Sequence, residues 1–203
     1  AIHALWTANG PISQPPRVVL IGDSSFDFAA GLFEYTAYQN QWRHLRWVNP
    51  QMADNFEDWK RLIFRAATVA DFILVSDYRQ LRQDASHPAF VSPEVVMQWT
   101  AQNSKAPVIG LTTAAAQDGA MLGIAAAGYE QGAHAASMAY ALTQGTPITM
   151  LPMVSGQQSR VSIRKTALTR SGFEMPFIYE AFAKAKAEHG SIDVLVNNAG
   201  ITR

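Results

Sequence analysis

The sequence of 203 residues contains no cysteine. Disulfide frameworks, thiolate nucleophiles and cysteine metal sites are therefore excluded together. The chain also has no net charge, because 16 basic residues balance 16 acidic ones, and no run of like charge stands out. A basic surface for nucleic acid or for an anionic membrane is not predicted. The partner that this composition favours is a small molecule.

Long apolar runs and closely spaced histidines are also missing. No stretch reaches the roughly 18 apolar residues that span a bilayer, and the first residues show no basic segment followed by an apolar one. No two histidines are three or four positions apart, the spacing that places two metal ligands on one helix face. They are His3, His44, His87, His134 and His189. The sequence predicts no metal and no other cofactor, and either a cytoplasmic protein or one whose targeting peptide has been removed.

Short apolar runs and helical patterns alternate along most of the chain. Apolar runs bounded by turn residues predict strands at 17–22, 44–48, 71–75, 107–111, 121–125 and 160–163. Helical spacing and capping residues predict helices at 26–41, 54–67, 92–102, 130–143 and 165–170. Asp54 and Ser92 are the predicted N-caps of two of these helices. The alternation predicts an α/β fold, a doubly wound parallel sheet with helices on both faces.

Polar residues directly follow the predicted strands. In open parallel sheets, ligands bind beyond the carboxyl ends of the strands, where helix N-termini also favour an anion. Hydroxyls, carboxylates and tyrosine rings at this edge would suit a small polar ligand. The same residue types are common in ordinary caps and turns, and that interpretation stays open for each of them. The candidate ligand residues are Ser24, Ser25, Ser76, Asp77, Tyr78, Thr112, Thr113 and Tyr129.

One pattern suggests a serine hydrolase instead. Residues 22–24 (Gly-Asp-Ser) resemble the nucleophile block of the GDSL-type esterases, and Asp84 and His87 have the spacing of that family's base pair. In that family the pair lies near the C-terminal end of the fold, and a Gly-x-Asn-Asp block adds oxyanion contacts. Here the pair lies in mid-chain and the block is missing. The hydrolase is the weaker alternative, and His87 is predicted to lie in a surface loop.

Most of the chain resembles one lobe of the periplasmic substrate-binding proteins of ABC importers, in the branch that includes aromatic amino-acid binders. The resemblance rests on VVLIGD at 18–23, ADFILVSD at 70–77, PVIGLTT at 107–113 and above all on residues 128–147, with a tyrosine, an alanine-rich helix and a glycine turn before proline. It implies a periplasmic-binding-protein-like lobe, flavodoxin-like or Rossmann-like in its three layers. It also implies a non-catalytic protein that binds an amino-acid-like ligand, located in the periplasm or otherwise outside the cytoplasm.

Members of that family clamp the ligand between two lobes, and this chain resembles only the second, C-terminal one. Matching the family's ligand loops to this sequence gives the same eight candidate residues as above. An ABC permease is the implied partner of the full-length protein. A missing N-terminal lobe leaves two other interpretations open: a sensory domain, or a homodimer formed through the surface that the first lobe would cover.

The end of the chain resembles a different family. Residues 187–203 are similar to the fourth strand and Asn-Asn-Ala-Gly motif of the short-chain dehydrogenases, especially the 3-oxoacyl-carrier-protein reductases. A glycine-rich phosphate turn is missing, and Tyr179 has Ala183 where the family's Tyr-x-x-x-Lys motif has lysine. A nicotinamide-dependent reductase fragment is thus the less favoured alternative, and the protein is predicted not to be an enzyme.

These patterns divide the chain into three parts. Residues 1–16 form an irregular leader, residues 17–176 form the lobe, and residues 177–203 are an appended segment that makes the chain a chimera. A lysine- and alanine-rich helix at 177–189 and a strand at 192–196 are predicted for the appended segment. Because an exposed apolar strand promotes aggregation, we expect that strand to dock on an edge of the sheet.

Overall fold

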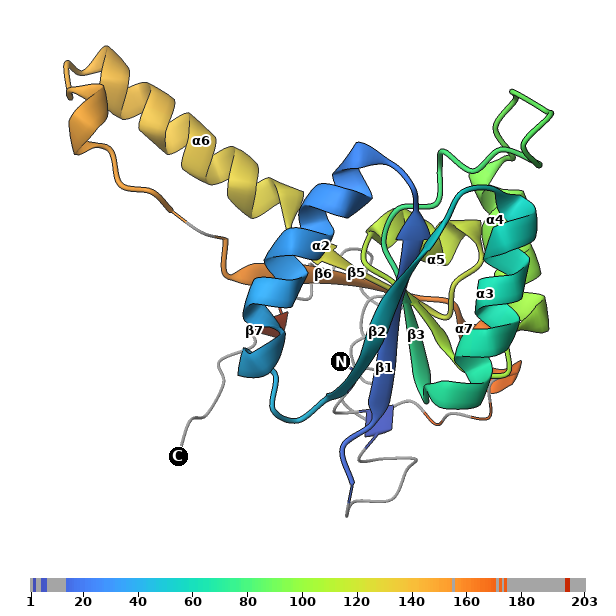
Figure 1. The fold of residues 1–203 in the computed structure, drawn as a ribbon. Helices are drawn as coiled ribbons and strands as arrows, with labels where there is room; N and C mark the ends of the chain where they lie inside the picture. Colours follow the sequence, from blue (N-terminus) through green and yellow to red (C-terminus); the bar gives the residue numbers. More distant parts are fainter. Residues whose placement is uncertain are drawn as a thin grey trace.

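The computed structural model describes residues 2, 5–6, 14–154, 156–170, 172, 174 and 196–197. Within them, the strands form one sheet in the order β2-β1-β3-β4-β5-β6-β7 (Figure 1). Their bounds are β1 (Arg17–Asp23), β2 (Arg46–Ala53), β3 (Phe72–Val75), β4 (Val108–Gly110), β5 (Leu122–Ala126), β6 (Gln158–Ile163) and β7 (Val196–Asn197). The first five strands are parallel, and β6 is antiparallel to both of its neighbours. The predicted doubly wound α/β fold is confirmed, and the sheet, predicted to be parallel, is parallel except for β6.

The central strands are continuous apolar runs because both faces of the sheet are covered. Every residue of β3 and β4 is buried, and so is every residue of β1 after Arg17. A strand with one face in water would instead alternate apolar and polar residues. Successive strands are added outward from β1 on both sides, which is the flavodoxin-like order 2-1-3-4-5 for the parallel part of the sheet.

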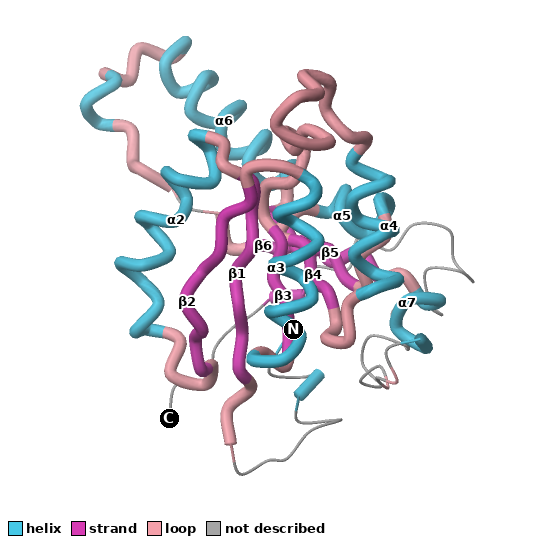
Figure 2. The backbone as a smooth tube through the Cα atoms, turned by 45° about the vertical axis from the view of Figure 1, so that its right-hand side comes forward, coloured by secondary structure: helices cyan, strands magenta, loops and turns pink. Residues whose placement is uncertain are grey.

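Helices pack on both faces of the sheet (Figures 1 and 2). Their bounds are α2 (Phe26–Tyr38), α3 (Phe56–Val69), α4 (Pro93–Asn103), α5 (Thr113–Asp118), α6 (Gly128–Thr143) and α7 (Lys165–Arg170). One apolar core lies under α3 and α4 and includes Trp59, whose indole Nε1–H donates to Thr100 Oγ1 at 2.8 Å. The other lies under α2 and α7 and includes Phe28 and Leu168.

Of the two predicted N-caps, Asp54 is wrong, whereas Ser92 is the N-cap residue of α4 but makes no capping hydrogen bond. Helix α3 is capped by Asn55 and not by Asp54, because the Asn55 side-chain oxygen accepts a hydrogen bond from the backbone N–H of Asp58 at 2.9 Å. Ser92 does precede α4, but its hydroxyl donates to the carboxylate of Glu94 and accepts no hydrogen bond from the helix backbone. Asp54 and Asn55 are both suitable cap residues by type, so the choice between them depends on backbone geometry that the sequence does not specify.

Two further elements differ from the sequence-based prediction. Strand β2 was predicted to end before Pro50 but continues through it, with an irregular register opposite Val19 and Ile21 of β1. Since β2 lies at the edge of the sheet, a proline there costs no ladder hydrogen bond on its open side. Helix α5 was not predicted, because six residues are too few to reveal helical periodicity.

Most of the appended segment and part of the leader lie outside the described residues. The predicted helix at 177–189 is among the undescribed residues, as is the predicted strand at 192–196 except for Val196. There, β7 pairs its backbone with Gln158 and Ser159 at the outer edge of β6. In the leader, Leu5 is buried in the core under α2.

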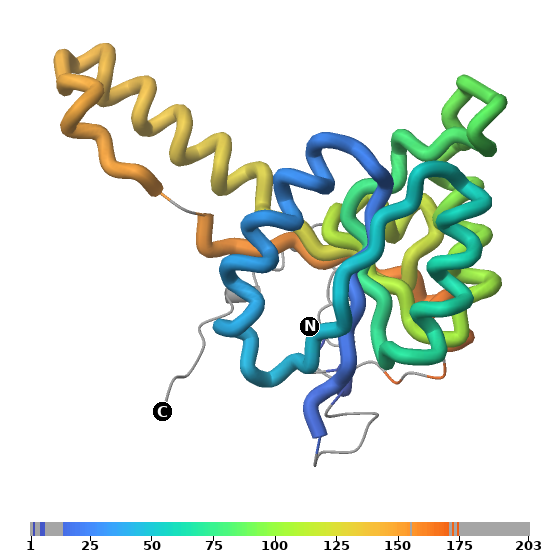
Figure 3. Tube along the Cα trace, in the orientation of Figure 1, coloured from blue at the N-terminus to red at the C-terminus, as the bar shows by residue number. Residues whose placement is uncertain are grey.

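Helix α6 projects away from the sheet (Figures 1 and 3). None of its residues is buried, and the chain returns through a 3-10 helix at Ile148–Met150. We call residues 128–157 the arm. Between Glu130 and Arg160 the sequence has no Asp, Glu, Lys or Arg. The large apolar side chains exposed on the arm are Tyr129, Tyr140, Leu142, Ile148, Met150, Met153 and Val154.

The two limbs of the arm are joined at its base. The Glu130 carboxylate accepts hydrogen bonds from the backbone N–H groups of Gln157 at 3.0 Å and Gln158 at 2.8 Å. These bonds hold the pKa of Glu130 below its ordinary range. They fix where the arm leaves the sheet and where it returns, and no residue of α6 is buried.

Candidate functional site

The loops after β1 and β3 meet at the carboxyl edge of the sheet. The backbone N–H of Asp23 donates to the carbonyl oxygen of Asp77 at 2.7 Å. The Asp23 side chain is 2% exposed and accepts hydrogen bonds from the backbone N–H groups of Ser25 at 3.1 Å and Gln80 at 2.9 Å. Asp23 thus fixes the two loops against each other, a role that the strand-end pattern alone did not reveal.

Ser24 and Ser25 occupy different environments at the start of α2. Ser25 is buried, and its hydroxyl oxygen accepts a hydrogen bond from the backbone N–H of Phe28 at 3.3 Å, so it caps the helix. Ser24 is exposed, one position before the cap. Of the two, Ser24 is the side chain that a molecule at this edge can reach.

The loop after β3 supplies a hydroxyl and a carboxylate. The Ser76 hydroxyl donates to Asp77 Oδ2 at 2.7 Å, and both side chains are half-buried. This hydrogen bond holds the carboxylate in a defined direction. Together with Ser24, the two residues place an acceptor group and two hydroxyls around the junction of β1 and β3.

Tyr78 points elsewhere. It is 1% exposed, and its hydroxyl donates to Asp118 Oδ2 at 2.5 Å. Arg79 Nη2 donates to the same oxygen at 2.8 Å. Burial, followed by the bond to Asp118, raises the pKa of Tyr78 well above its ordinary value. Tyr78 therefore secures α5 to the β3 loop. No sequence pattern pointed to Arg79 or Asp118, because both contacts span about 40 positions of chain.

The remaining candidates lie farther along the same edge. Thr112 is exposed and caps α5, since its hydroxyl oxygen accepts from the Ala115 backbone N–H at 3.3 Å, and Thr113 is half-buried. Gly123 of β5 lets α5 approach, because a Cβ atom there would lie 2.5 Å from the carbonyl oxygen of Thr112. Tyr129 is 89% exposed at the base of the arm. The structure thus gathers Ser24, Ser76 and Asp77, while Tyr129 stands apart on α6.

Of the three residues in the hydrolase pattern, the structure brings Asp84 and His87 into contact. Asp84 and His87 do form a pair, with 2.7 Å between Asp84 Oδ2 and His87 Nδ1, in an exposed loop. Hydrogen bonds from Ser86, and then from His87, lower the pKa of Asp84 to about 2. Within the described part of the chain, no hydrogen bond links Ser24 to His87. A general base in contact with the nucleophile is the first requirement of such a site.

The described residues contain neither a metal-binding cluster nor a membrane-spanning helix. No group of three or more His, Asp or Glu side chains is placed to hold a metal ion there. No helix in this part of the chain is long and apolar enough to cross a membrane.

Comparison with known proteins gives one match to a family model and several solved structures of similar fold. Residues 88–185 match the family model described as ABC transporter substrate binding protein. A ligand-free, open substrate-binding protein with adhesive properties from Clostridium difficile has a similar fold, with a TM-score of 0.59 and 14% identity over 85% of this chain. The family match supports an ABC-transporter substrate-binding domain over residues 88–185. The comparison with curated proteins found no match.

Two further solved structures share the fold of this chain. One is the ABC domain of a protein from Streptococcus pneumoniae in complex with L-Trp, with a TM-score of 0.56 and 16% identity over 90% of this chain. The other is a conserved domain protein from Vibrio cholerae, with a TM-score of 0.55 and 21% identity over 84% of this chain. The chain spans 54% to 58% of the length of these three structures. At such identities the likeness concerns the fold.

Proposed function

We propose that this chain is a non-catalytic ligand-binding lobe of an ABC-importer-type solute receptor and that its ligand resembles an amino acid. The observation that carries the proposal is the partial family match on a fold whose loops converge at the carboxyl edge. In open parallel sheets this is the edge at which ligands bind. The L-Trp complex of a structural neighbour adds support for an amino-acid-like ligand.

The chemistry of the edge suits a zwitterion. The partial positive charge at the N-terminus of α2 favours a carboxylate near Ser24, although Asp27 in the first turn offsets part of it. Asp77, oriented by Ser76, offers an acceptor for an ammonium group at the adjoining loop. Thr112 and Thr113 add polar groups one strand farther along. Tyr129, exposed on α6 farther along the edge, is proposed as a wall for an apolar side chain. Tyr78 takes part only indirectly, by holding the β3 loop through Asp118.

The arm provides an argument for a second lobe. Its exposed side chains are apolar and aromatic, and it carries no charge beyond Glu130. Depletion of charge together with exposed Tyr and Met side chains is typical of the centre of an interface. Because the chain covers only 58% and 54% of two structural neighbours, we propose that the arm packs against a second lobe of the full-length protein. Such a receptor would work outside the cytoplasm and deliver its ligand to an ABC permease.

The same surface favours one alternative. If no second lobe is present, a second copy of the chain could cover the arm, and the protein would be a dimerising or sensory domain. The two proposals differ in stoichiometry, so native mass spectrometry of the purified protein separates them. A retained small mass on a monomer supports the binding lobe, whereas a bare dimer supports the alternative.

The binding proposal is tested by thermal shift with the twenty amino acids added singly. We expect one amino acid or a related group to raise the melting temperature. Asp77→Asn should weaken that ligand at least about tenfold, because a hydrogen bond to a charged group contributes about 1.5–3 kcal/mol. Asp84→Asn makes the same change in an exposed loop and should leave the affinity unchanged. If no amino acid stabilises the wild type, or if both variants respond equally, the proposed site is wrong.

A further inference from the structure

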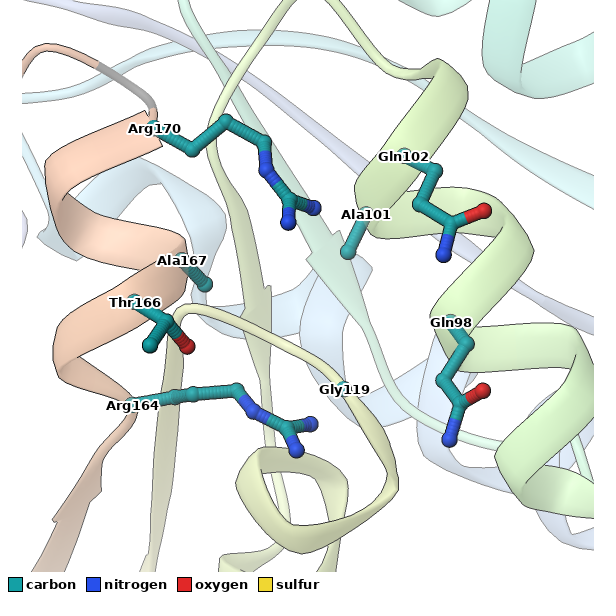
Figure 4. Close-up of a pocket in the computed structure, with 8 residues that line it drawn as sticks. All are labelled: Gln98, Ala101, Gln102, Gly119, Arg164, Thr166, Ala167 and Arg170. Atoms are coloured by element: carbon teal, nitrogen blue, oxygen red, sulfur yellow. The ribbon is translucent and has the colours of Figure 1, made fainter.

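A pocket of about 190 Å³ lies at the amino edge of the sheet, opposite the edge just described. Three elements surround it: α4, the turn between α5 and β5, and the start and body of α7 (Figure 4). The antiparallel direction of β6 brings α7 to this edge, because Ile163 at the end of β6 pairs with Leu122 at the start of β5. The pocket is smaller than the ~300–1,000 Å³ typical of sites for drug-sized ligands.

The lining of the pocket is rich in hydrogen-bond donors. Arg164 and Arg170 extend from the α7 side toward α4, where Gln98 and Gln102 line the opposite wall (Figure 4). The Thr166 hydroxyl lies between the two arginines along α7. Among the described residues that line the pocket, none is acidic. The two guanidinium groups thus give this pocket a net positive charge.

The two arginines have almost no partners in the described part of the chain. Arg164 Nη1 donates one long hydrogen bond, 3.4 Å, to the carbonyl oxygen of Gln117. For Arg170, no ion pair or side-chain hydrogen bond is found within the same residues. The nearby carboxylate of Asp118 is buried and already accepts hydrogen bonds from Tyr78 and Arg79. Most of the N–H donors of both guanidinium groups are therefore available to a ligand.

The backbone around the pocket is fixed. Gly119 forms one wall with φ 144°, and a Cβ atom there would lie 2.9 Å from the backbone nitrogen of Gln98. Glycine at this position therefore allows the α5–β5 turn to lie against α4. On the other side, the backbone N–H of Arg164 donates to the carbonyl oxygen of Met121 at 2.9 Å, which anchors the first residue before α7.

We propose that this pocket is a binding site for a small dianionic oxyanion of the phosphate type, free or carried by a small metabolite. Guanidinium groups match phosphate oxygens in pairs of parallel hydrogen bonds, and two of them facing one small space favour a doubly charged group over a carboxylate. The site is independent of the proposed amino-acid site, because the two lie at opposite ends of the strands. Loss of one leaves the other intact.

The test is a titration of the ¹⁵N-labelled full chain with inorganic phosphate at constant ionic strength, kept with sodium chloride and followed by NMR. We expect saturable shifts of the Nε–H signals of Arg164 and Arg170 and of the backbone amides of Gly119 and Thr166. Glycerol 3-phosphate, titrated in the same way, distinguishes the two sources: tighter binding than inorganic phosphate assigns the site to a phosphorylated metabolite, and equal or weaker binding assigns it to the free ion.

Matched variants make the result specific. Arg164→Gln and Arg170→Gln should each weaken phosphate at least about tenfold, since each removes charge-assisted hydrogen bonds. Arg170 is exposed, so its variant tests the site even if substitution of the half-buried Arg164 disturbs folding. Arg65→Gln removes the same charge from an exposed position of α3 and should bind as the wild type does. Shifts that rise linearly without saturation, or equal affinities in all three variants, would overturn the proposal.

Discussion

The backbone N–H of Asp23 donates a 2.7 Å hydrogen bond to the carbonyl oxygen of Asp77. This bond joins two loops that are separated by more than fifty positions of chain but follow neighbouring strands. The buried Asp23 carboxylate adds two further hydrogen bonds to backbone N–H groups in the same region. The candidate ligand edge is therefore held rigid at the junction of β1 and β3, where a binding site needs fixed geometry.

Removing the Tyr78 hydroxyl should affect stability. In Tyr78→Phe, the buried Asp118 carboxylate loses one of its two hydrogen bonds. We expect the free energy of unfolding to fall by about 1–3 kcal/mol in urea denaturation. Tyr129→Phe makes the same change at an exposed tyrosine and should stay within about 0.5 kcal/mol of the wild type. Equal stability of the two variants would contradict the role given to Tyr78.

Two glycines should respond to alanine in opposite ways. In Gly123→Ala, the new methyl group would meet the Thr112 carbonyl oxygen at 2.5 Å, so α5 must move and the protein should lose about 1–3 kcal/mol. In Gly132→Ala, no atom lies within 4 Å of the new methyl group, and α6 should gain up to about 1 kcal/mol from helix propensity. Denaturation curves test the first, and helical circular dichroism tests the second. A stable Gly123→Ala variant would mean that α5 does not pack as described.

The pair Arg17 and Asp71 should make stability depend on acid pH. Burial raises the pKa of Asp71, but the hydrogen bonds and charge of Arg17 outweigh it and lower the pKa below the ordinary 3.8. A carboxyl with a lowered pKa stabilises the fold above 3.8, and that contribution is lost as the pH falls through the folded-state pKa. The advantage of the wild type over Asp71→Asn should therefore shrink below pH 3.8. At higher pH it should be no more than about 1 kcal/mol, because Arg17 is partly exposed.

Chemical denaturation of both proteins between pH 2 and 7 measures this difference. Asp54→Asn, at an exposed position, is the control, and its curve should run parallel to that of the wild type. A difference between wild type and Asp71→Asn that grows on acidification would show that the sign is wrong.

The arm should contribute little to the stability of the isolated chain. Ile148 on the arm is 74% exposed, whereas Ile63 in the core under α3 is fully buried. Ile63→Ala should cost about 2–5 kcal/mol, and Ile148→Ala should stay within about 0.5 kcal/mol. Under the dimeric alternative, the second variant should also reduce self-association in sedimentation velocity, because it removes exposed apolar surface. A large loss of stability in Ile148→Ala would mean that the arm is packed in solution.

The sequence identified the strands because their residues must be buried on both faces. The runs at 71–75 and 107–111 contain almost only apolar residues. Because they are too short for a typical helix, a buried strand is the regular element that fits them. The same logic fails at β2, where an edge strand tolerates Pro50, and at α5, which is too short to show a period. Local patterns also could not choose between Asp54 and Asn55 as a cap, since both have suitable side chains.

At the candidate site, the sequence located the edge but not the orientation of its side chains. Tyr78 and Tyr129 looked equivalent as residues that follow strands, yet one is buried against Asp118 and the other is exposed on the arm. Arg79 and Asp118 were not candidates at all. Their contact depends on the packing of α5 against the β3 loop, and no short-range pattern encodes that distance.

The sequence by itself determined the alternation of strands with all helices but the short α5, the parallel character of most of the sheet and the edge where its loops converge. It could do so because burial imposes periodicities that span only a few residues. The tertiary structure alone decided which side chains reach that edge, that two arginines face one pocket at the opposite edge, and that the arm stands free of the core. Each of these depends on contacts between residues that are distant in the chain, which only the packing of the sheet and its helices brings together.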